Sequence, residues 1–212
     1  MNYRYIFWDN DGVLVDTERY YLQASREALD RVDIQLSNQQ FAEISLGEGL
    51  SIFDIAAASG ISGQTILELK EWRHKRYAGL LEQAEIALDG AAEVLKDLHG
   101  RVGMAVVTSS QRQHFEIIHR RTGFLPYFDF CLTREDYASS KPSAEPYLLA
   151  LKHCGHAAED VLVIEDSPRG LKAAKAAGLA CWVIPGHYTS AQDFAEADRL
   201  LYDIREIMQL TL

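Results

Sequence analysis

The chain has 212 residues, 48% of them hydrophobic and 25% charged, which fits one folded domain with or without an insert and excludes a disordered or disulfide-based protein. Its 31 acidic and 21 basic side chains give a net charge of −10, which disfavours nucleic acid and acidic membranes as partners. Its apolar stretches are too short for a membrane span, and no signal-peptide pattern opens the chain. We therefore expect a soluble, cytoplasmic protein whose three cysteines are reduced and mostly buried.

The predicted elements begin with an apolar strand at 5–8. A run of helices follows from about residue 18 to 87, in which Ser37 to Gln40 fits a capping box and glycines mark the turns. Short apolar runs then alternate with helical stretches. We predict strands at 104–107, 130–132, 161–164 and 181–184, helices at 111–122, 145–153 and 170–177, and a weaker last unit with a strand at 200–202 and a helix at 204–210.

This alternation is typical of βαβ units, in which helices cover both faces of a parallel sheet. We therefore predict an α/β fold with a helical insert after the first strand. The α/β core is assigned residues 1–16 and 88–212, and the helical insert residues 17–87. An insert at this point would lie over the carboxyl ends of the strands, where open parallel sheets bind ligands.

Two carboxylates, Asp9 and Asp11, directly follow the first strand and precede Gly12. One of them could attack a substrate or bind a cation while the other serves as acid or base, and the glycine permits a sharp turn. Strand termination by Asp and Gly is the simpler alternative. An EF-hand calcium loop has similar spacings, but Phe7 would take its first ligand position and a strand precedes it.

Hydroxyl groups and a lysine follow later strands. Thr108, Ser109 and Ser110 end the second strand just before a helix, where hydroxyls and free N–H groups suit a phosphate oxygen. The alternative is that Ser110 only caps the helix. Lys141 lies in a serine-rich loop, where it is either solvated or a cation fixed beside a phosphate.

Glu165 and Asp166 follow the strand at 161–164 and precede Ser167 and Pro168. Capping of the next helix by Asp or Ser would explain them. Two adjacent carboxylates facing Asp9 would, however, repel one another unless a divalent cation lay between them. Ligands that are all oxygen favour Mg²⁺.

The four strand ends thus supply an acid pair, a hydroxyl, a lysine and a second acid pair, and this set resembles the haloacid dehalogenase superfamily of phosphohydrolases. Its four motifs match Asp9-Asn10-Asp11-Gly12, Thr108, Lys141 and Glu165-Asp166. The resemblance implies a Rossmann-like three-layer core with a parallel sheet, and it makes the insert a small helical cap domain. The branch it resembles contains phosphoglycolate phosphatase, sugar phosphatases and β-phosphoglucomutase.

The resemblance implies that Asp9 attacks a phosphate ester and becomes an aspartyl phosphate. Asp11 would protonate the leaving alcohol and then activate water. The expected activity is a Mg²⁺-dependent phosphatase acting on a small phosphorylated metabolite of the sugar phosphate or phosphoglycolate type. Its cap would close over this metabolite by moving at 16–17 and 87–90, and would exclude water.

The resemblance also assigns the ligands. Mg²⁺ would be held by Asp9, the main-chain carbonyl of Asp11, Asp166 and, directly or through water, Glu165. The non-bridging phosphate oxygens would be held by Thr108, Ser109 and Lys141.

Two other activities remain as alternatives. The mutase of this branch has a histidine and an arginine where this chain places Tyr21 and Leu50, so a second phosphate would be poorly held and hydrolysis is favoured. A phosphoacceptor switch resembling response-regulator receivers is disfavoured by Asp11, which would speed loss of the phosphoryl group, and by the large insert. Asp11 also disfavours dehalogenation. Composition leaves the oligomeric state open.

Three further features receive structural interpretations. The basic segment 72–76 is interpreted as a solvated helix face, although one of its residues could contact an anionic substrate. Tyr20 and Tyr21 are interpreted as packing residues at the cap hinge, with contact to substrate as the alternative. The histidines and cysteine of 153–156 are interpreted as a helix end, not a metal cluster.

Overall fold

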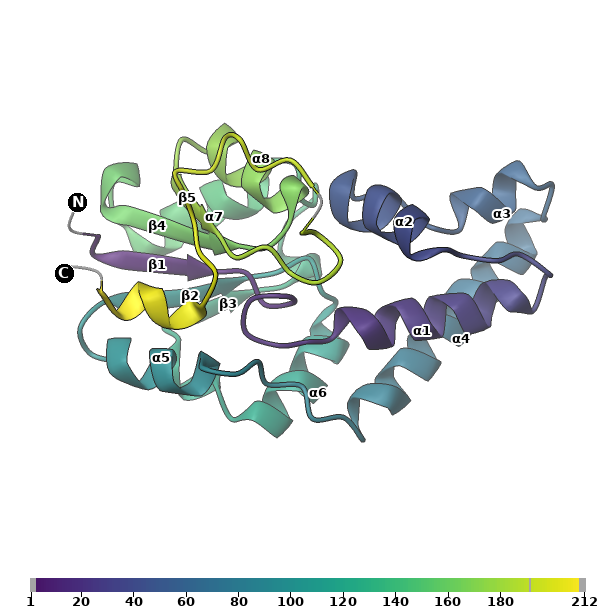
Figure 1. Cartoon of the computed structure of the whole chain (residues 1–212), viewed down its shortest axis with the longest axis horizontal. Helices are drawn as coiled ribbons and strands as arrows, with labels where there is room; N and C mark the ends of the chain where they lie inside the picture. The colour runs from purple at the N-terminus through teal and green to yellow at the C-terminus, as the bar shows by residue number, and fades with distance from the viewer. Residues whose placement is uncertain (1–2, 191, 210–212) are drawn as a thin grey trace.

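The structure is a computed structural model that describes residues 3–190 and 192–209. At its centre lies a six-stranded sheet in the order β3-β2-β1-β4-β5-β6, with every neighbouring pair parallel (Figure 1). The strands are β1 (Tyr5–Trp8), β2 (Gly103–Val107), β3 (Phe130–Leu132), β4 (Val161–Glu165), β5 (Ala180–Val183) and β6 (Arg199–Leu200).

Strand β1 lies at the middle of the sheet, with Tyr5 paired to Gly103 of β2 and to Val161 of β4. All four residues of β1 are buried, as expected for a strand covered on both faces. Ile6 and Trp8 belong to one hydrophobic cluster, whereas Tyr5 and Phe7 belong to another. The two faces of this one strand therefore support two separate cores.

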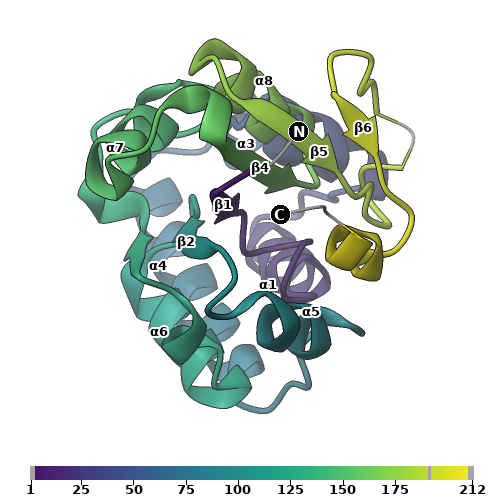
Figure 2. The ribbon, with the colours of Figure 1, turned by 90° about the vertical axis from the view of Figure 1, so that its left-hand side faces the viewer.

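Helices cover both faces (Figure 2). Helices α5 (Ala91–Leu98) and α6 (Arg112–Thr122) bury their apolar sides in the cluster of Ile6 and Trp8, together with the 3-10 helix Ile204–Gln209. Helices α7 (Glu145–Cys154) and α8 (Pro168–Ala176) pack on the other face. The predicted three-layer α/β fold is confirmed.

The segment between β1 and α5 is helical and has a third hydrophobic cluster of its own. It contains α1 (Glu18–Asp30), α2 (Asn38–Phe41), a π-helical continuation Ala42–Gly47, α3 (Asp54–Ala58) and α4 (Gly63–Leu81). The predicted capping box of Ser37 and Gln40 opens α2. Figure 1 shows these helices beyond the carboxyl ends of the strands, and we refer to residues 17–87 as the cap. The domain boundaries themselves stay a prediction.

The chain leaves and re-enters the core along one short ribbon. The N–H of Asp16 donates to the carbonyl of Ile86 at 2.7 Å, and the N–H of Leu88 donates to that of Leu14 at 3.0 Å. Val15 and Ala87 form an antiparallel bridge between these bonds. The two predicted hinge segments therefore begin side by side.

Most predicted strands and core helices match the structure to within two residues. The last unit differs, because the strand is limited to 199–200 and a 3-10 helix replaces the predicted α-helix, whose residue 210 lies outside the described residues. The Glu206 carboxylate accepts hydrogen bonds from the N–H groups of Tyr202 and Asp203 and so fixes a tight turn there.

The three cysteines are free, but only Cys181 is fully buried. Within the described ranges no helix is long and apolar enough to cross a membrane.

Candidate active site

The loop after β1 turns sharply and brings its carboxylates against the end of β4. Gly12 has a φ of +85°, and its N–H donates to the carbonyl of Val15 at 2.8 Å. A side chain at Gly12 would overlap the carboxylate of Asp166. Glycine at this position therefore serves both the turn and the close approach of the two loops.

Lys141 is 2% exposed, so it is not the solvated lysine of the alternative interpretation. Its Nζ donates to Asp9 Oδ1 at 2.6 Å, to Glu165 Oε1 at 2.6 Å and to the carbonyl of Val107 at 2.7 Å. Burial lowers the pKa of Lys141, but the charges of Asp9 and Glu165 outweigh it and raise the pKa overall. A permanent cation thus links the ends of β1, β2 and β4.

Glu165 is held by four donors. Besides Lys141, its oxygens accept from the Tyr147 hydroxyl at 2.7 Å, the Ser167 hydroxyl at 3.1 Å and the N–H of Asp166 at 3.2 Å. A Cβ at Gly170 would overlap the Glu165 carboxylate, so α8 presses its backbone against this group. These contacts immobilise Glu165 and orient Lys141.

Asp9, Glu165 and Asp166 form a buried acidic cluster whose ligand oxygens lie within 4.8 Å of one another. The Oδ2 atom of Asp166 is buried without a hydrogen-bond partner. Burial raises the pKa of Asp9 to about 7 although Lys141 opposes the shift, and burial with the neighbouring acid Glu18 raises that of Asp166. An unpartnered buried oxygen among crowded carboxylates fits a divalent cation with oxygen ligands.

Asp11 collects hydrogen bonds from hydroxyl groups. Its carboxylate accepts from Thr17, from Ser110 at 2.6 Å and from Thr108 at 3.3 Å. The interpretation of Ser110 as a plain helix cap is wrong, because Gln111 is the N-cap residue of α6 and the Ser110 hydroxyl is turned toward Asp11. Asp11 is thus placed beside the hydroxyls predicted to bind phosphate.

These groups border a cavity of about 400 Å³ that lies between the strand ends and the cap. The core lines it with predicted site residues: Asp9, Asp11, Thr108, Ser109 and Asp166. Tyr21 and Leu50, the residues that distinguish this chain from the mutase, also line it. Tyr21 packs edge-on against Tyr77 at 5.3 Å, so it both packs in the cap and faces the cavity. Lys141 and Glu165 are not among the lining residues. They are joined to the lining through the hydrogen bond from Lys141 to Asp9.

The prediction of a solvated face for 72–76 is wrong at Arg73. This residue is 7% exposed, and its guanidinium lies over the rings of Tyr21 at 4.7 Å and Phe53 at 5.1 Å. Its Nε is buried without a partner, and it lines the cavity. The helix spreads its charges as expected, but other cap elements cover the side that carries Arg73. Lys75, by contrast, is exposed.

Sequence reasoning missed several other cavity residues. Glu18 is nearly buried, and burial together with Asp11 raises its pKa to about 8. Arg169 opposes that shift and has a buried Nε without a partner. His74 of α4 and His114 of α6 stack at 5.5 Å across the seam between cap and core. Of these residues only Glu18 could have been suspected from the sequence, because it is an acid at the start of the first helix after the motif Asp9 to Gly12.

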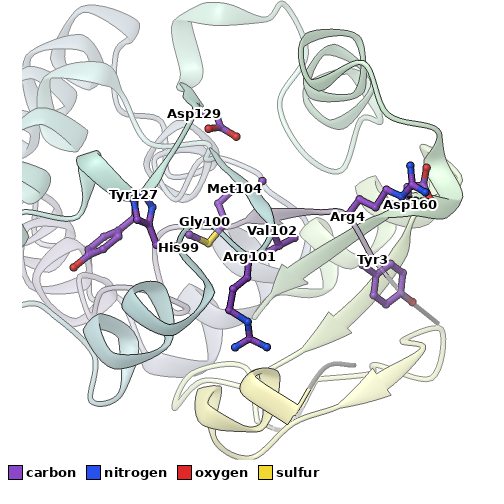
Figure 3. Close-up of a pocket in the computed structure, with 11 residues that line it drawn as sticks. Tyr3, Arg4, His99, Gly100, Arg101, Val102, Met104, Tyr127, Asp129 and Asp160 are labelled. Atoms are coloured by element: carbon purple, nitrogen blue, oxygen red, sulfur yellow. Dashed lines mark ion pairs between the residues drawn. The ribbon is translucent and has the colours of Figure 1, made fainter. Parts of the chain in front are cut away.

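A second hollow, of about 630 Å³, lies at the amino ends of the strands (Figure 3). Its charged groups are paired: Arg4 lies 3.9 Å from Asp160, Arg101 pairs with Asp97, and Asp129 accepts from Tyr5 at 2.7 Å. Figure 3 shows Arg4 and Arg101 pointing in different directions. This hollow therefore lacks the converging unpaired groups of the first cavity.

The histidines at 153 and 156 do not form a cluster. Helix α7 ends at Cys154, and Gly155 follows in the left-handed conformation. The His153 ring contacts Phe130 at 5.3 Å, whereas the His156 ring contacts Tyr5 at 5.5 Å. The interpretation as a helix end is confirmed.

Known proteins are similar to this chain in sequence and in fold. The sequence profile of the family described as Haloacid dehalogenase-like hydrolase matches residues 6–184. Protein CbbY of Cereibacter sphaeroides is 30% identical over 213 residues, which cover 95% of this chain and 93% of that protein. Fructose-1-phosphate phosphatase YqaB of Escherichia coli (strain K12) is 31% identical over 186 residues, which cover 84% and 94%. The crystal structure of CbbY from Rhodobacter sphaeroides in complex with phosphate has a TM-score of 0.83 at 29% identity, covering 97% and 96%. The chain belongs to the family of haloacid dehalogenase-like hydrolases.

Proposed function

We propose that the protein is a Mg²⁺-dependent phosphatase that hydrolyses a small phosphorylated metabolite, of the sugar phosphate or phosphoglycolate type. One observation carries the proposal: Asp9 is held by Lys141 at 2.6 Å, lies in one acidic cluster with Asp166, whose buried Oδ2 has no partner, and borders the same cavity as Asp11. A nucleophile, an acid or base and a place for a cation thus lie around one space.

Asp9 is the proposed nucleophile. Its carboxylate attacks phosphorus, the bond from phosphorus to the ester oxygen breaks, and that oxygen leaves with the bonding electrons and a proton from Asp11. Water then attacks the phosphorus of the aspartyl phosphate and gives a proton to Asp11. The bond from phosphorus to the Asp9 oxygen breaks, so inorganic phosphate leaves and the Asp9 carboxylate is restored. One carboxylate thus forms the covalent bond while the other exchanges the proton.

The proposed ligands of Mg²⁺ are Asp9, Asp166, the main-chain carbonyl of Asp11 and Glu165, the last acting directly or through water. When bound, the ion neutralises charge on the phosphoryl group and on the crowded carboxylates. Thr108, Ser109 and Lys141 are proposed to hold the non-bridging oxygens. The distance of 2.6 Å from the Lys141 ammonium to Asp9 supports this role, since the cation would lie beside the transferred group.

A small metabolite fits a cavity of about 400 Å³, and the name of the relative YqaB, a fructose-1-phosphate phosphatase, points to the same class. We propose the cytoplasm as the compartment, in keeping with three free cysteines. Residues 17–87 are proposed to move as a cap about 16–17 and 87–90.

The β-phosphoglucomutase-like alternative gains one argument, because the buried guanidinium of Arg73 could hold a second anionic group.

The test measures inorganic phosphate released from a panel of sugar phosphates, phosphoglycolate and nucleotides, with Mg²⁺ or with EDTA. The native protein should release phosphate only with Mg²⁺, and Asp9→Asn should abolish release. Conversion of a hexose 1-phosphate without phosphate release would support the mutase, and a stable phosphoprotein without turnover would support the switch. Release that survives Asp9→Asn would overturn the assigned nucleophile.

A further inference from the structure

The side chain of Asn10 is a hydrogen-bond bridge between the catalytic loop and the core. Asn10 stands between Asp9 and Asp11 and is fully buried. Its Nδ2 donates to Asp11 Oδ2 at 3.3 Å, and its Oδ1 lies 2.9 Å from His119 Nε2. An amide nitrogen can only donate and a carboxylate only accepts, so the bond to Asp11 turns the amide oxygen toward an N–H donor.

His119 supplies that donor from the last turn of α6. It is 1% exposed, and its ring packs against Phe115 at 4.3 Å. Its Nδ1 lies 3.2 Å from the Thr122 hydroxyl and accepts from it, while Nε2–H donates to Asn10. Burial lowers the pKa of His119 to about 4 although Asp11 opposes the shift, so the ring is neutral and has one N–H. The hydrogen bonds therefore run in one direction, from Thr122 through His119 and Asn10 to Asp11.

This arrangement is more than stability alone requires. Asn10 and His119 are 109 residues apart in the sequence and face one another among apolar side chains, where a pair of aliphatic residues would need no partners. The hydroxyl donors to Asp11 can rotate and exchange donation for acceptance. The Asn10 amide cannot reverse while His119 donates to its oxygen. Asn10 is thus a donor of fixed direction beside Asp11.

We propose that His119 is a positioning residue: acting through Asn10, it holds the Asp11 carboxylate in the orientation in which that group exchanges a proton with the leaving oxygen. The proposal rests on the function proposed above. In the step concerned the proton passes from Asp11 to the ester oxygen as the bond to phosphorus breaks. Neither His119 nor Asn10 touches the substrate or exchanges a proton with it.

The test compares kcat/KM for an alkyl phosphate hydrolysed by the protein with kcat/KM for p-nitrophenyl phosphate. Nitrophenolate leaves without a proton, so its release does not depend on Asp11 as an acid. His119→Leu should lower kcat/KM for the alkyl phosphate roughly tenfold and change that for the aryl phosphate by less than about threefold. His119→Gln should keep most of the native kcat/KM for the alkyl phosphate, because the glutamine amide can donate to Asn10.

Two further variants separate positioning from damage to the fold. Ile118→Val truncates a buried neighbour on α6, so it should lower the melting temperature and leave the ratio of the two kcat/KM values unchanged. Asn10→Leu with His119→Leu removes both members of the buried pair, so neither is left facing an apolar partner, and the double variant should alter the ratio no more than Asn10→Leu alone.

An equal fall for both substrates in His119→Leu, or no recovery in a folded His119→Gln, would overturn the proposal. If the native protein hydrolyses both substrates with Mg²⁺ and the ratio is unchanged in His119→Leu, this inference alone fails. If the native protein hydrolyses neither substrate with Mg²⁺ while it remains folded, the proposed function fails, and this inference fails with it.

Discussion

The ammonium of Lys141 and the carboxylate of Glu165 lie 2.6 Å apart, and both side chains are almost completely buried. Lys141→Met would leave Glu165 and Asp9 as buried carboxylates without their cation. We expect a loss of about 3–5 kcal/mol in the free energy of unfolding, measured by urea denaturation without Mg²⁺. The control Lys175→Met breaks a surface pair with Asp198 and should cost less than about 1 kcal/mol. Equal losses in the two variants would contradict the assigned role.

Mg²⁺ should stabilise the folded protein through the acidic cluster. At a free concentration about 100 times its Kd, the ion adds about 2.7 kcal/mol, which for a chain of this size raises the melting temperature by about 5–10 °C. Asp166→Asn should lose most of this shift, whereas Glu71→Gln on the exposed side of α4 should retain it. The measurement is differential scanning fluorimetry with Mg²⁺ or EDTA. A full shift in Asp166→Asn would place the ion elsewhere.

Arg73 should contribute to substrate affinity. Its guanidinium is buried at the cavity with a free Nε, and a lost hydrogen bond to a charged group costs about 1.5–3 kcal/mol, so Arg73→Leu should lower kcat/KM roughly tenfold or more, mainly through KM. Lys75→Gln, two residues away on the exposed face, should have the kinetics of the native protein. An unchanged KM together with a lower melting temperature would make Arg73 a packing residue of the cap.

His119 should make the fold less stable in mild acid. Burial lowers its pKa from 6.5 to about 4, so between these values the unfolded chain binds a proton that the folded chain does not. Its neutral form supports the fold fully above pH 6.5, and the native protein should lose up to about 3 kcal/mol relative to His119→Gln as the pH falls to 4. Urea denaturation of both proteins at several pH values measures this difference. Parallel curves would show that His119 is protonated in the folded state.

Gly170 should tolerate no side chain. A Cβ there would overlap the carboxylate of Glu165, which also orients Lys141, so Gly170→Ala should destabilise the fold and weaken the Mg²⁺-induced shift. Gly79 is the matched control, because it lies inside helix α4 with open space around it. Gly79→Ala should raise the free energy of unfolding by up to about 1 kcal/mol. Thermal unfolding of both variants tests the contrast.

The sequence was sufficient to predict elements whose signals are local. The apolar runs that end at Trp8, Val107 and Ile164 predict the central strands, because a strand buried on both faces needs a continuous apolar stretch. The polar residues after them were predicted to converge, because parallel strands end at one edge of the sheet. The end of α7 at Cys154 was likewise visible in the glycine that follows it.

The features that the sequence did not predict depend on contacts between distant segments. Arg73 is spaced like a solvated residue on α4, and only the packing of Tyr21 and Phe53 against it removes it from water. The bond between Asn10 and His119 joins the loop after β1 to α6, and neither residue is unusual in its local sequence. Ser110 matches a helix cap in type and place, and only the position of Asp11 shows where its hydroxyl points.

The ribbon that joins residues 14–16 to residues 86–88 has a consequence for how such a chain can diverge. The chain leaves the sheet and returns at neighbouring points, so the strand order is independent of the length and shape of the segment between them. Substitutions, insertions or exchange of that whole segment can alter which molecule is recognised while Asp9 and Asp11 stay at the end of β1. If the cap recognises the substrate as proposed, recognition and chemistry are encoded in largely separate stretches of the polypeptide, and Thr17, whose hydroxyl donates to Asp11, is the point where the two stretches meet.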